Sequence, residues 1–221
     1  MRLGQLLATA LVAALLSIAA IPAHASPNGA GLAPKSLAHA QAIRTELDAR
    51  YRALPGRGLR VTEATSTGIV REFALLTPDL LGARFLPADN GIWYGICPAG
   101  ATCPYPARRA SPPGDAAARR LALELALRTF LETSASVVAV SLPTRHFTAF
   151  IVGRDELVGE VGLAALARAL SGNPARMLSA SAQAVVDGVT RPRIFVFTGL
   201  EPTPNGGDYW GGIPRWPSVR T

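Results

Sequence analysis

Residues 116–133 carry the most regular apolar pattern in the chain, and this pattern restricts the fold more than any other feature. Large apolar side chains recur through the segment, with charged residues between them, at Leu121, Leu123, Leu125, Leu127, Phe130 and Leu131. A helix with such a broad apolar face must be buried against a larger apolar surface. We therefore predict a central helix that begins after Asp115, its expected N-cap, and packs on a β-sheet.

Most other apolar runs have the length and composition of β-strands. We predict strands over 59–64, 69–76, 83–87, 92–96, 137–142, 147–152 and 194–198. Asp89-Asn90-Gly91 separates two of these runs, and Asn-Gly is a strong hairpin signal because both residues tolerate positive φ. The first four strands are thus expected to form an antiparallel unit. The connection over 143–146 is short enough to close a second hairpin between the next two predicted strands, 137–142 and 147–152.

Further helices are predicted over 36–54, with Ser36 as N-cap, and over 155–170 and 174–186. The complete order is one helix, four strands, one helix, two strands, two helices and one strand. No βαβ unit is repeated in it. This order predicts an α+β fold, in which a mostly antiparallel sheet is built from hairpins and the helices pack on one face.

The N-terminus has the three parts of a secretory signal peptide. Arg2 gives a short positive start, an apolar run follows over Leu6–Ile21, and Pro22 precedes Ala23-His24-Ala25. We expect cleavage after Ala25 and a secreted or extracytoplasmic location at the cell surface. The alternative is an uncleaved anchor, but the apolar run is shorter than the ~20 residues that span a bilayer. No later segment is apolar enough to span one.

The pattern along the chain divides it into four expected regions. These are a signal peptide over 1–25, a flexible linker over 26–35, a single α+β domain over 36–200 and an irregular tail over 201–221. The tail contains Pro and Trp but has no helical or strand period. We expect it to wrap the surface of the domain.

The chain is basic, and removal of Arg2 with the signal lowers its formal net charge from +7 to +6. Lys35 is the only lysine, and the abundance of Arg, Ala, Gly and Pro is typical of a high-GC bacterial genome. A basic exported protein suits an anionic cell-envelope polymer or another envelope protein as partner. The arginines are scattered, however, so a mildly basic solvated surface is the simpler interpretation. No nucleic-acid partner is expected.

Two cysteines, Cys97 and Cys103, lie close together in the sequence. In an oxidising compartment such a pair favours a structural disulfide. A redox pair or half of a metal site is the alternative. Redox motifs usually have two intervening residues, and the chain has no second Cys/His group for zinc. We expect no metal and no cofactor.

Catalytic motifs are absent from the sequence: no Gly-x-Ser-x-Gly, no Ser-x-x-Lys and no glycine-rich phosphate loop occurs. His146 could act as a general base with Ser141 or Thr144, but a turn histidine without a special role is the simpler interpretation. The carboxylates Glu63 and Glu72 could face each other across the first hairpin. We favour the interpretation that these two carboxylates are simply exposed on a strand surface.

The segment 93–109 is the most unusual in composition, because it combines aromatic residues with arginines. Its candidate binding residues are Trp93, Tyr105, Arg108 and Arg109, which could stack sugars or hold an anionic polymer. Simple packing of Trp93 or Tyr94 in the core is the alternative. We conclude that the chain is an exported, non-catalytic envelope-associated or extracellular binding domain. A secreted hydrolase that uses His146 with an unidentified partner is the alternative.

The signal peptide gives a direct prediction. The exported protein should begin at Ser26, and its intact mass should correspond to residues 26–221. N-terminal sequencing and mass spectrometry of the exported fraction measure this. A chain that keeps residues 1–25 and sediments with membranes would contradict it.

Overall fold

The structure, a computed structural model, describes residues 33–54, 58–68, 70–77, 82–100, 116–144, 147–158, 166–167, 170, 172–174, 178–202 and 208–214. Its elements follow in chain order: α2 (Pro34–Arg52), β1 (Leu59–Ser66), β2 (Glu72–Leu76), β3 (Ala83–Pro87), β4 (Gly91–Pro98), α3 (Ala116–Glu132), β5 (Val137–Leu142), β6 (Thr148–Gly153), α4 (Arg154–Val158), α6 (Ala180–Thr190), the 3-10 turn η1 (Arg191–Arg193), β7 (Ile194–Pro202) and β8 (Asp208–Pro214).

Eight strands form one mixed sheet in the described part of the chain, in the order β1-β4-β5-β6-β7-β8-β2-β3. Five of the seven neighbouring pairs are antiparallel, whereas β4–β5 and β2–β8 are parallel. The fold is therefore α+β with a mostly antiparallel sheet, as predicted. The predicted hairpin between β5 and β6 is confirmed.

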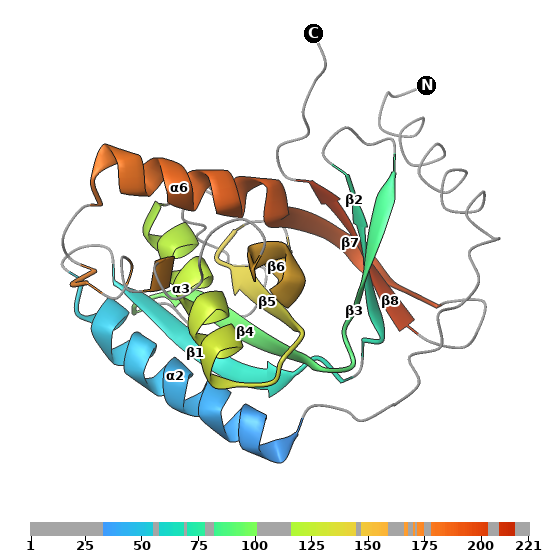
Figure 1. The fold of residues 1–221 in the computed structure, drawn as a ribbon, viewed down its shortest axis with the longest axis horizontal. Coiled ribbons are helices and arrows are strands. Elements are labelled where there is room, and N and C mark those ends of the chain that lie inside the picture. Colours follow the sequence, from blue (N-terminus) through green and yellow to red (C-terminus); the bar gives the residue numbers. More distant parts are fainter. Residues whose placement is uncertain are drawn as a thin grey trace, which may run out of the picture.

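One face of the central strands carries the larger core cluster. Side chains at alternate positions of β4 and β5, such as Tyr94, Val138 and Val140, pack there with buried residues of α2, α3 and α6. Helix α3 lies between α2 and α6 and contacts both (Figure 1). Twelve of its seventeen residues are buried, so the central helix predicted from residues 116–133 is confirmed.

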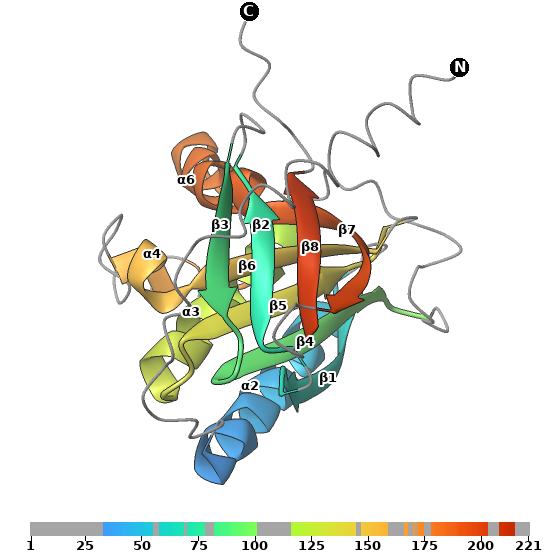
Figure 2. The ribbon, with the colours of Figure 1, turned by 90° about the vertical axis from the view of Figure 1, so that its right-hand side faces the viewer.

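The opposite face of the same strands carries a second core cluster. Val137 and Ala139 of β5 pack there with Phe73 and Leu75 of β2 and with Phe195 of β7. The far end of the sheet therefore curls back over its own centre. Figure 2 shows β3, β2 and β8 in front of β4, β5 and β6, which they cross, with α3 behind.

Glu124 is a charged residue on α3 that the fold buries almost completely, with 1% of its surface exposed. Its Oε2 accepts a hydrogen bond from the Tyr51 hydroxyl at 2.8 Å, and its Oε1 pairs with Arg50 Nη1 at 2.8 Å. Burial, followed by the Glu124 charge, raises the pKa of Tyr51, so the phenol stays a neutral donor. These contacts fasten α2 to α3.

Two arginines on α3 are also buried and bind other parts of the chain. Arg119 pairs with Asp187 of α6 at 2.7 Å, and Arg120 donates to the carbonyls of Leu170 and Gly172 at 3.1 and 3.0 Å. Burial alone would raise the pKa of Asp187, but the hydrogen bonds it accepts and the arginine charges around it outweigh burial and lower that pKa. Helix α3 thus holds α6 as well as α2.

The predicted pairing of the first four strands is only partly right: β2 and β3 pair antiparallel as predicted, but β1 does not pair with β2, and β3 does not pair with β4. β1 pairs with β4, and β3 has β2 as its only neighbour in the described sheet, so the Asn90-Gly91 turn joins strands that do not pair. Gly91 serves close packing instead of a hairpin. A Cβ at that position would overlap the Thr67 hydroxyl and the Val137 side chain.

The predicted irregular tail is also wrong in part. Residues 208–214 form β8, which lies between β7 and β2, and β7 itself extends to Pro202. The prediction failed because Gly211, Gly212 and Pro214 conceal the strand pattern. Gly212 has a packing reason, since a Cβ there would press on the side chains of Leu75 and Phe195.

The helix limits differ from the predicted ones by a few residues. α2 begins at Pro34, inside the predicted linker, with Ala33 as N-cap; Ser36 lies within the helix, where its Oγ contacts Ser134 Oγ at 3.0 Å. The helix predicted over 174–186 is found at 180–190, and Ser179 caps it. α4 covers the start of the helix predicted over 155–170; the described residues Leu166, Ala167 and Leu170 are also helical, and the remainder lies outside the described residues. Asp115 lies outside the described residues.

The buried carboxylate predicts a graded loss of stability. Glu124→Ala leaves the buried Tyr51 hydroxyl without its acceptor and the partly buried Arg50 without its shorter ion pair, and should lower the free energy of unfolding by about 3 kcal/mol. Tyr51→Phe removes one hydrogen bond to a charged group and should cost about 1.5–3 kcal/mol. Urea unfolding of the purified variants measures both losses.

The matched control is Glu46, which pairs with Arg128 at 2.6 Å but is half exposed. Glu46→Gln should change the free energy of unfolding by less than about 1 kcal/mol. Equal losses for Glu46→Gln and Glu124→Ala would contradict the structural role of Glu124.

Candidate functional site

Trp93, the one candidate binding residue of segment 93–109 that the structure describes, belongs to a cluster of four aromatic rings. Its ring stacks on Phe147 with centroids 5.8 Å apart and planes 2° from parallel. Phe73 lies 6.4 Å from Trp93 on one side, and Phe197 lies 5.7 Å from Phe147 on the other. We call Phe73, Trp93, Phe147 and Phe197 the aromatic row.

Four segments supply the aromatic row, and strand pairing fixes its geometry. Trp93 lies opposite Ala139 of β5, on the face away from α3, because Tyr94 points to the helices. Phe147 precedes β6, and its carbonyl accepts a hydrogen bond from the Phe197 amide at 2.9 Å. This bond holds the two phenylalanine side chains side by side.

The aromatic row is buried at its ends and partly exposed in its middle. Phe73 is fully buried and Phe197 is 8% exposed, whereas Trp93 and Phe147 are only partly buried. Stacked rings with free surface can hold a flat apolar group, such as a sugar ring, an aromatic side chain or a peptide plane. The row is therefore suited to contact with a partner molecule.

The edge strand beside Trp93 adds polar groups to the same face. Thr65 of β1 lies opposite Trp93, Glu63 opposite Gly95, and Arg60 opposite Cys97. Arg60 is partly buried, and its Nε has no hydrogen-bond partner among the described residues. The surface next to the row thus offers a hydroxyl, a carboxylate and a guanidinium.

The other three residues predicted for this site lie outside the described part of the chain. They are Tyr105, Arg108 and Arg109. Cys97 is fully buried on β4, but Cys103 lies outside the described residues. The Cys97–Cys103 disulfide therefore stays a prediction.

The candidate catalytic hydroxyls near His146 are buried. Ser141 is 1% exposed and Thr144 is 4% exposed. The Oγ of Ser141 has no hydrogen-bond partner among the described residues. His146 lies outside the described residues. Ser141 lies opposite Ala149, on the face that carries the aromatic row.

Glu63 and Glu72, the two carboxylates considered as a pair from the sequence, do not lie together. Glu63 and Glu72 lie on β1 and β2, which are not neighbours in the sheet. Burial raises the pKa of Glu72. Glu156 is held by Arg84 and, at 3.2 Å, by Arg193. Glu63 and Glu72 are therefore not placed for general acid–base work on one substrate.

A hollow of about 420 Å³ lies where the turn before β4 meets the start of α4. Arg154 lines it, and this guanidinium donates to the carbonyls of Phe130, Thr133 and Ala135, which end α3 and follow it. Glu156 lines it too and is already paired. The charged groups of this hollow therefore mainly hold the fold together.

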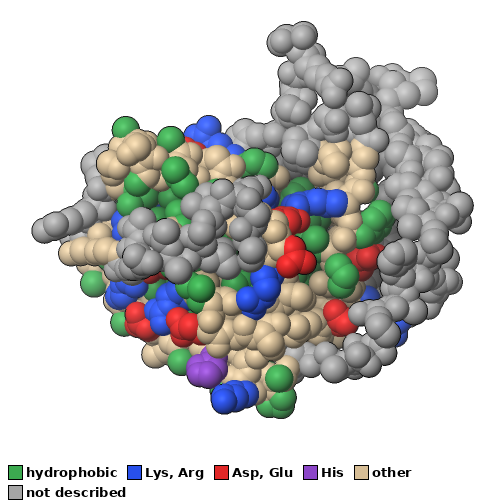
Figure 3. Space-filling view, viewed as in Figure 1, with side chains coloured by type: hydrophobic (Ala, Val, Ile, Leu, Met, Phe, Trp, Pro, Cys, Tyr) green, Lys and Arg blue, Asp and Glu red, His purple; other side chains and the backbone are tan. Residues whose placement is uncertain are grey.

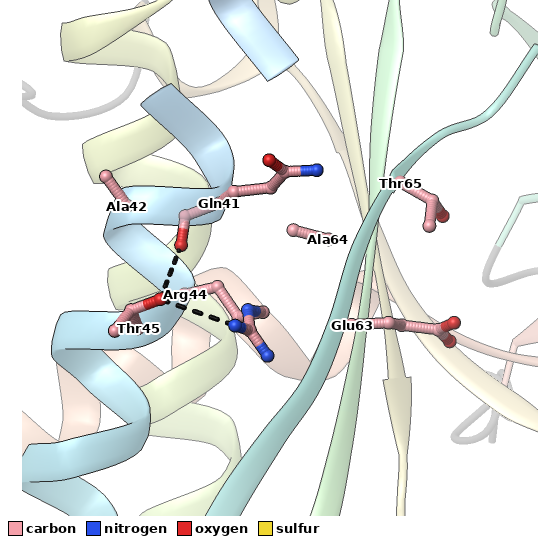
Figure 4. A pocket seen from close by; sticks show the side chains of 7 residues that line it. All are labelled: Gln41, Ala42, Arg44, Thr45, Glu63, Ala64 and Thr65. Carbon is pink, nitrogen blue, oxygen red and sulfur yellow. Dashed lines mark hydrogen bonds between the residues drawn. The ribbon is translucent and has the colours of Figure 1, made fainter. Parts of the chain in front are cut away.

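A second hollow, of about 480 Å³, lies between α2 and the free edge of β1. Gln41 and Arg44 reach into it from the helix, and Ala64 faces them from the strand (Figure 4). Glu63 and Thr65 line it from the strand but point away from the helix. This hollow is open to solvent and is lined mainly by polar side chains.

The described part of the chain has no group of three or more His, Cys, Asp or Glu side chains that could hold a metal ion. None of its helices is long and apolar enough to cross a bilayer. No family model, no curated protein and no solved structure matches the chain.

Sequence reasoning found Trp93 but missed its partners. Phe147 and Phe197 were recognised only as residues of predicted strands. The available signal was their position: each is an aromatic residue in a predicted strand, and the structure places both with the second core cluster. Such residues meet only when the sheet brings their strands close together. The sequence does not show that β4, β6 and β7 do so.

Proposed function

We propose that this protein is an exported, non-catalytic binding domain of the cell envelope or the extracellular space, and that it holds its partner on the aromatic row. The observation that carries the proposal is the stacked pair of Trp93 and Phe147, which is only partly buried although it packs against the core. Rigid aromatic side chains provide large contact area at little cost in conformational entropy, and they dominate many binding interfaces.

The position of the helices supports this proposal. Buried residues of α2, α3 and α6 belong to one cluster with Tyr94 and Val138, on the face away from Trp93. We propose that all helices of the chain lie on that face of the sheet. Of the described elements, the curled β2, β3 and β8 then cover the face with the aromatic row, and we propose that its margin next to β1 receives the partner.

The distribution of charge indicates that the aromatic contact contributes more to partner binding than the net charge of the chain does. Many described arginines are already paired inside the fold, among them Arg50, Arg119, Arg128 and Arg193. On the face shown in Figure 3, basic and acidic side chains of the described residues are interspersed and form no large basic patch among themselves. We therefore propose another envelope protein as partner in preference to an anionic polymer.

Export is part of the proposal and rests on the sequence of residues 1–25. The cleaved chain would work in an oxidising compartment, where the proposed bond between Cys97 and Cys103 is stable. Cys97 lies two residues beyond Gly95, on the same face of β4 as Trp93. The proposed disulfide would therefore form at the end of the strand that carries the binding residue.

Trp93→Ala tests the proposed function. The cleaved wild-type protein, immobilised and crosslinked with envelope material from its native cells, should retain one partner, and Trp93→Ala should reduce that retention about tenfold. Retention should change little between low and high salt, because most of the contact is apolar. Quantitative mass spectrometry of the retained material gives the measurement.

Phe85→Ala is the matched control, because Phe85 is an exposed aromatic residue on β3 outside the aromatic row. It should retain the partner at the wild-type level. Equal retention by Trp93→Ala and the wild type would contradict the proposal. Retention that disappears at high salt and ignores Trp93 would indicate an anionic polymer instead.

A secreted hydrolase that uses His146 is the second candidate, and one observation favours it. The Ser141 hydroxyl is buried without a partner among the described residues, on the strand that leads toward His146. The burial of Ser141, however, argues against the hydrolase, because a nucleophile must contact its substrate.

Labelling with a fluorophosphonate probe decides between the two functions. The binding domain should not react, and Ser141→Ala should behave as the wild type does. Stoichiometric labelling of the wild type that is lost in both Ser141→Ala and His146→Ala would establish the hydrolase and contradict the binding domain.

A further inference from the structure

Among the described residues, no backbone or side-chain hydrogen bond reaches the outer edge of β1 along half of its length. β1 ends the sheet and has β4 as its only neighbour among the described strands. Near its start, α2 side chains bond this edge: Asp48 Oδ1 accepts from the Val61 amide at 2.9 Å, and Arg44 approaches the Thr62 carbonyl at 3.5 Å. The register shifts between Val61 and Glu63. No such contact is recorded for Glu63–Ser66.

The backbone groups that point outward from this half follow from the pairing pattern. Thr67 donates its amide hydrogen to Gly91 across the β1–β4 pair. In an antiparallel pair, residues with inward and outward hydrogen-bonding groups alternate. Thr65 and Glu63 therefore bond β4, and the N–H and C=O groups of Ala64, which is 6% exposed, and of Ser66, which is exposed, point to the outer edge of β1.

The hollow of about 480 Å³ between α2 and β1 lies at this free half. Arg44 projects into it (Figure 4), where its other recorded contact is with Thr45 Oγ1 at 3.3 Å. No carboxylate lies within ion-pair distance of Arg44 among the described residues, although many other arginines of the chain are paired. The hollow therefore combines a row of backbone groups with one positive charge that has no counterion among the described residues.

We propose that the free half of β1 binds an extended segment of another polypeptide as an added strand, with a carboxylate of that segment paired to Arg44. A row of N–H and C=O groups at strand spacing recognises another extended backbone, because only a backbone repeats donors and acceptors at that spacing. The hollow beside Arg44 accepts the side chain that carries the carboxylate. This site goes beyond the proposed function, since it does not require Trp93 or Phe147.

Charge favours a foreign acidic segment over a second copy of this chain. Pairing two copies through β1 would bring two Arg44 guanidinium groups and two positively charged chains together. Like charges at an interface oppose association. An acidic segment gains a charge-assisted hydrogen bond at the same position.

The test uses the cleaved full chain and a displayed library of random short peptides as the probe. The wild type should enrich peptides that contain an acidic residue within a run of β-formers. Hydrogen exchange with a synthetic copy of an enriched peptide should slow at the amides of Ala64 and Ser66, and change little at Thr65, which already bonds β4.

Two variants locate the binding. Ala64→Pro removes an outward N–H, which an edge strand tolerates, and should abolish binding of the enriched peptide. Arg44→Gln should weaken it about tenfold, because it removes one charge-assisted bond. Lys35→Gln, a charge loss in the first turn of the same helix, should bind as the wild type does, and so should Trp93→Ala.

Three outcomes would overturn this proposal. They are no enrichment by the wild type, binding of enriched peptides that Arg44→Gln leaves unchanged, and self-association of the wild-type chain through β1 that Ala64→Pro abolishes. Arg44→Gln and the exchange data decide the matter if Ala64→Pro does not fold. The behaviour of Trp93→Ala separates failure at β1 from failure of the proposed function.

Discussion

The burial of three charged residues on one helix sets the architecture of this protein. Glu124, Arg119 and Arg120 lie inside the fold, where an unpaired charge would cost several kcal/mol. Each must therefore meet a partner from another segment: Glu124 from α2, Arg119 from α6, and Arg120 from the carbonyls of 170 and 172. These directional contacts fix the positions of α2 and α6. Burial of apolar side chains alone would specify these positions less strictly.

The position of the helices decides what the sheet can offer. With α2 and α3 packed on Tyr94 and its neighbours, the other face is covered by the sheet's own end, where Phe73 and Leu75 meet β5. That cover stops at Trp93 and Phe147, which remain partly exposed. α2 also bonds only the first part of the β1 edge. Both candidate contact surfaces therefore lie where the packing of a neighbouring element ends.

Local sequence patterns predicted the elements well and their pairing poorly. The α3 helix and the β5–β6 hairpin were predictable because their signals, a broad apolar face and two dense strands with a short loop, are contained within the segment. The β1–β4 pair, the β8 strand and the aromatic row were not, since they depend on residues far apart in the chain. Asn90-Gly91 misled the prediction because a glycine required for close packing looks the same in sequence as one required for a turn. Of the candidate site, Trp93 was predicted, whereas its stacking partner Phe147 needed the strand order.

Photo-crosslinking inside the native cells examines the aromatic row under the conditions where the protein works. Benzoylphenylalanine in place of Phe147 would put a reactive group beside Trp93, and the same group in place of Phe85 would put it on β3, outside the row. A binding face at the aromatic row predicts a discrete adduct with one envelope protein from position 147 and none from position 85. Adducts from both positions alike, or from neither, would contradict a binding face at Trp93.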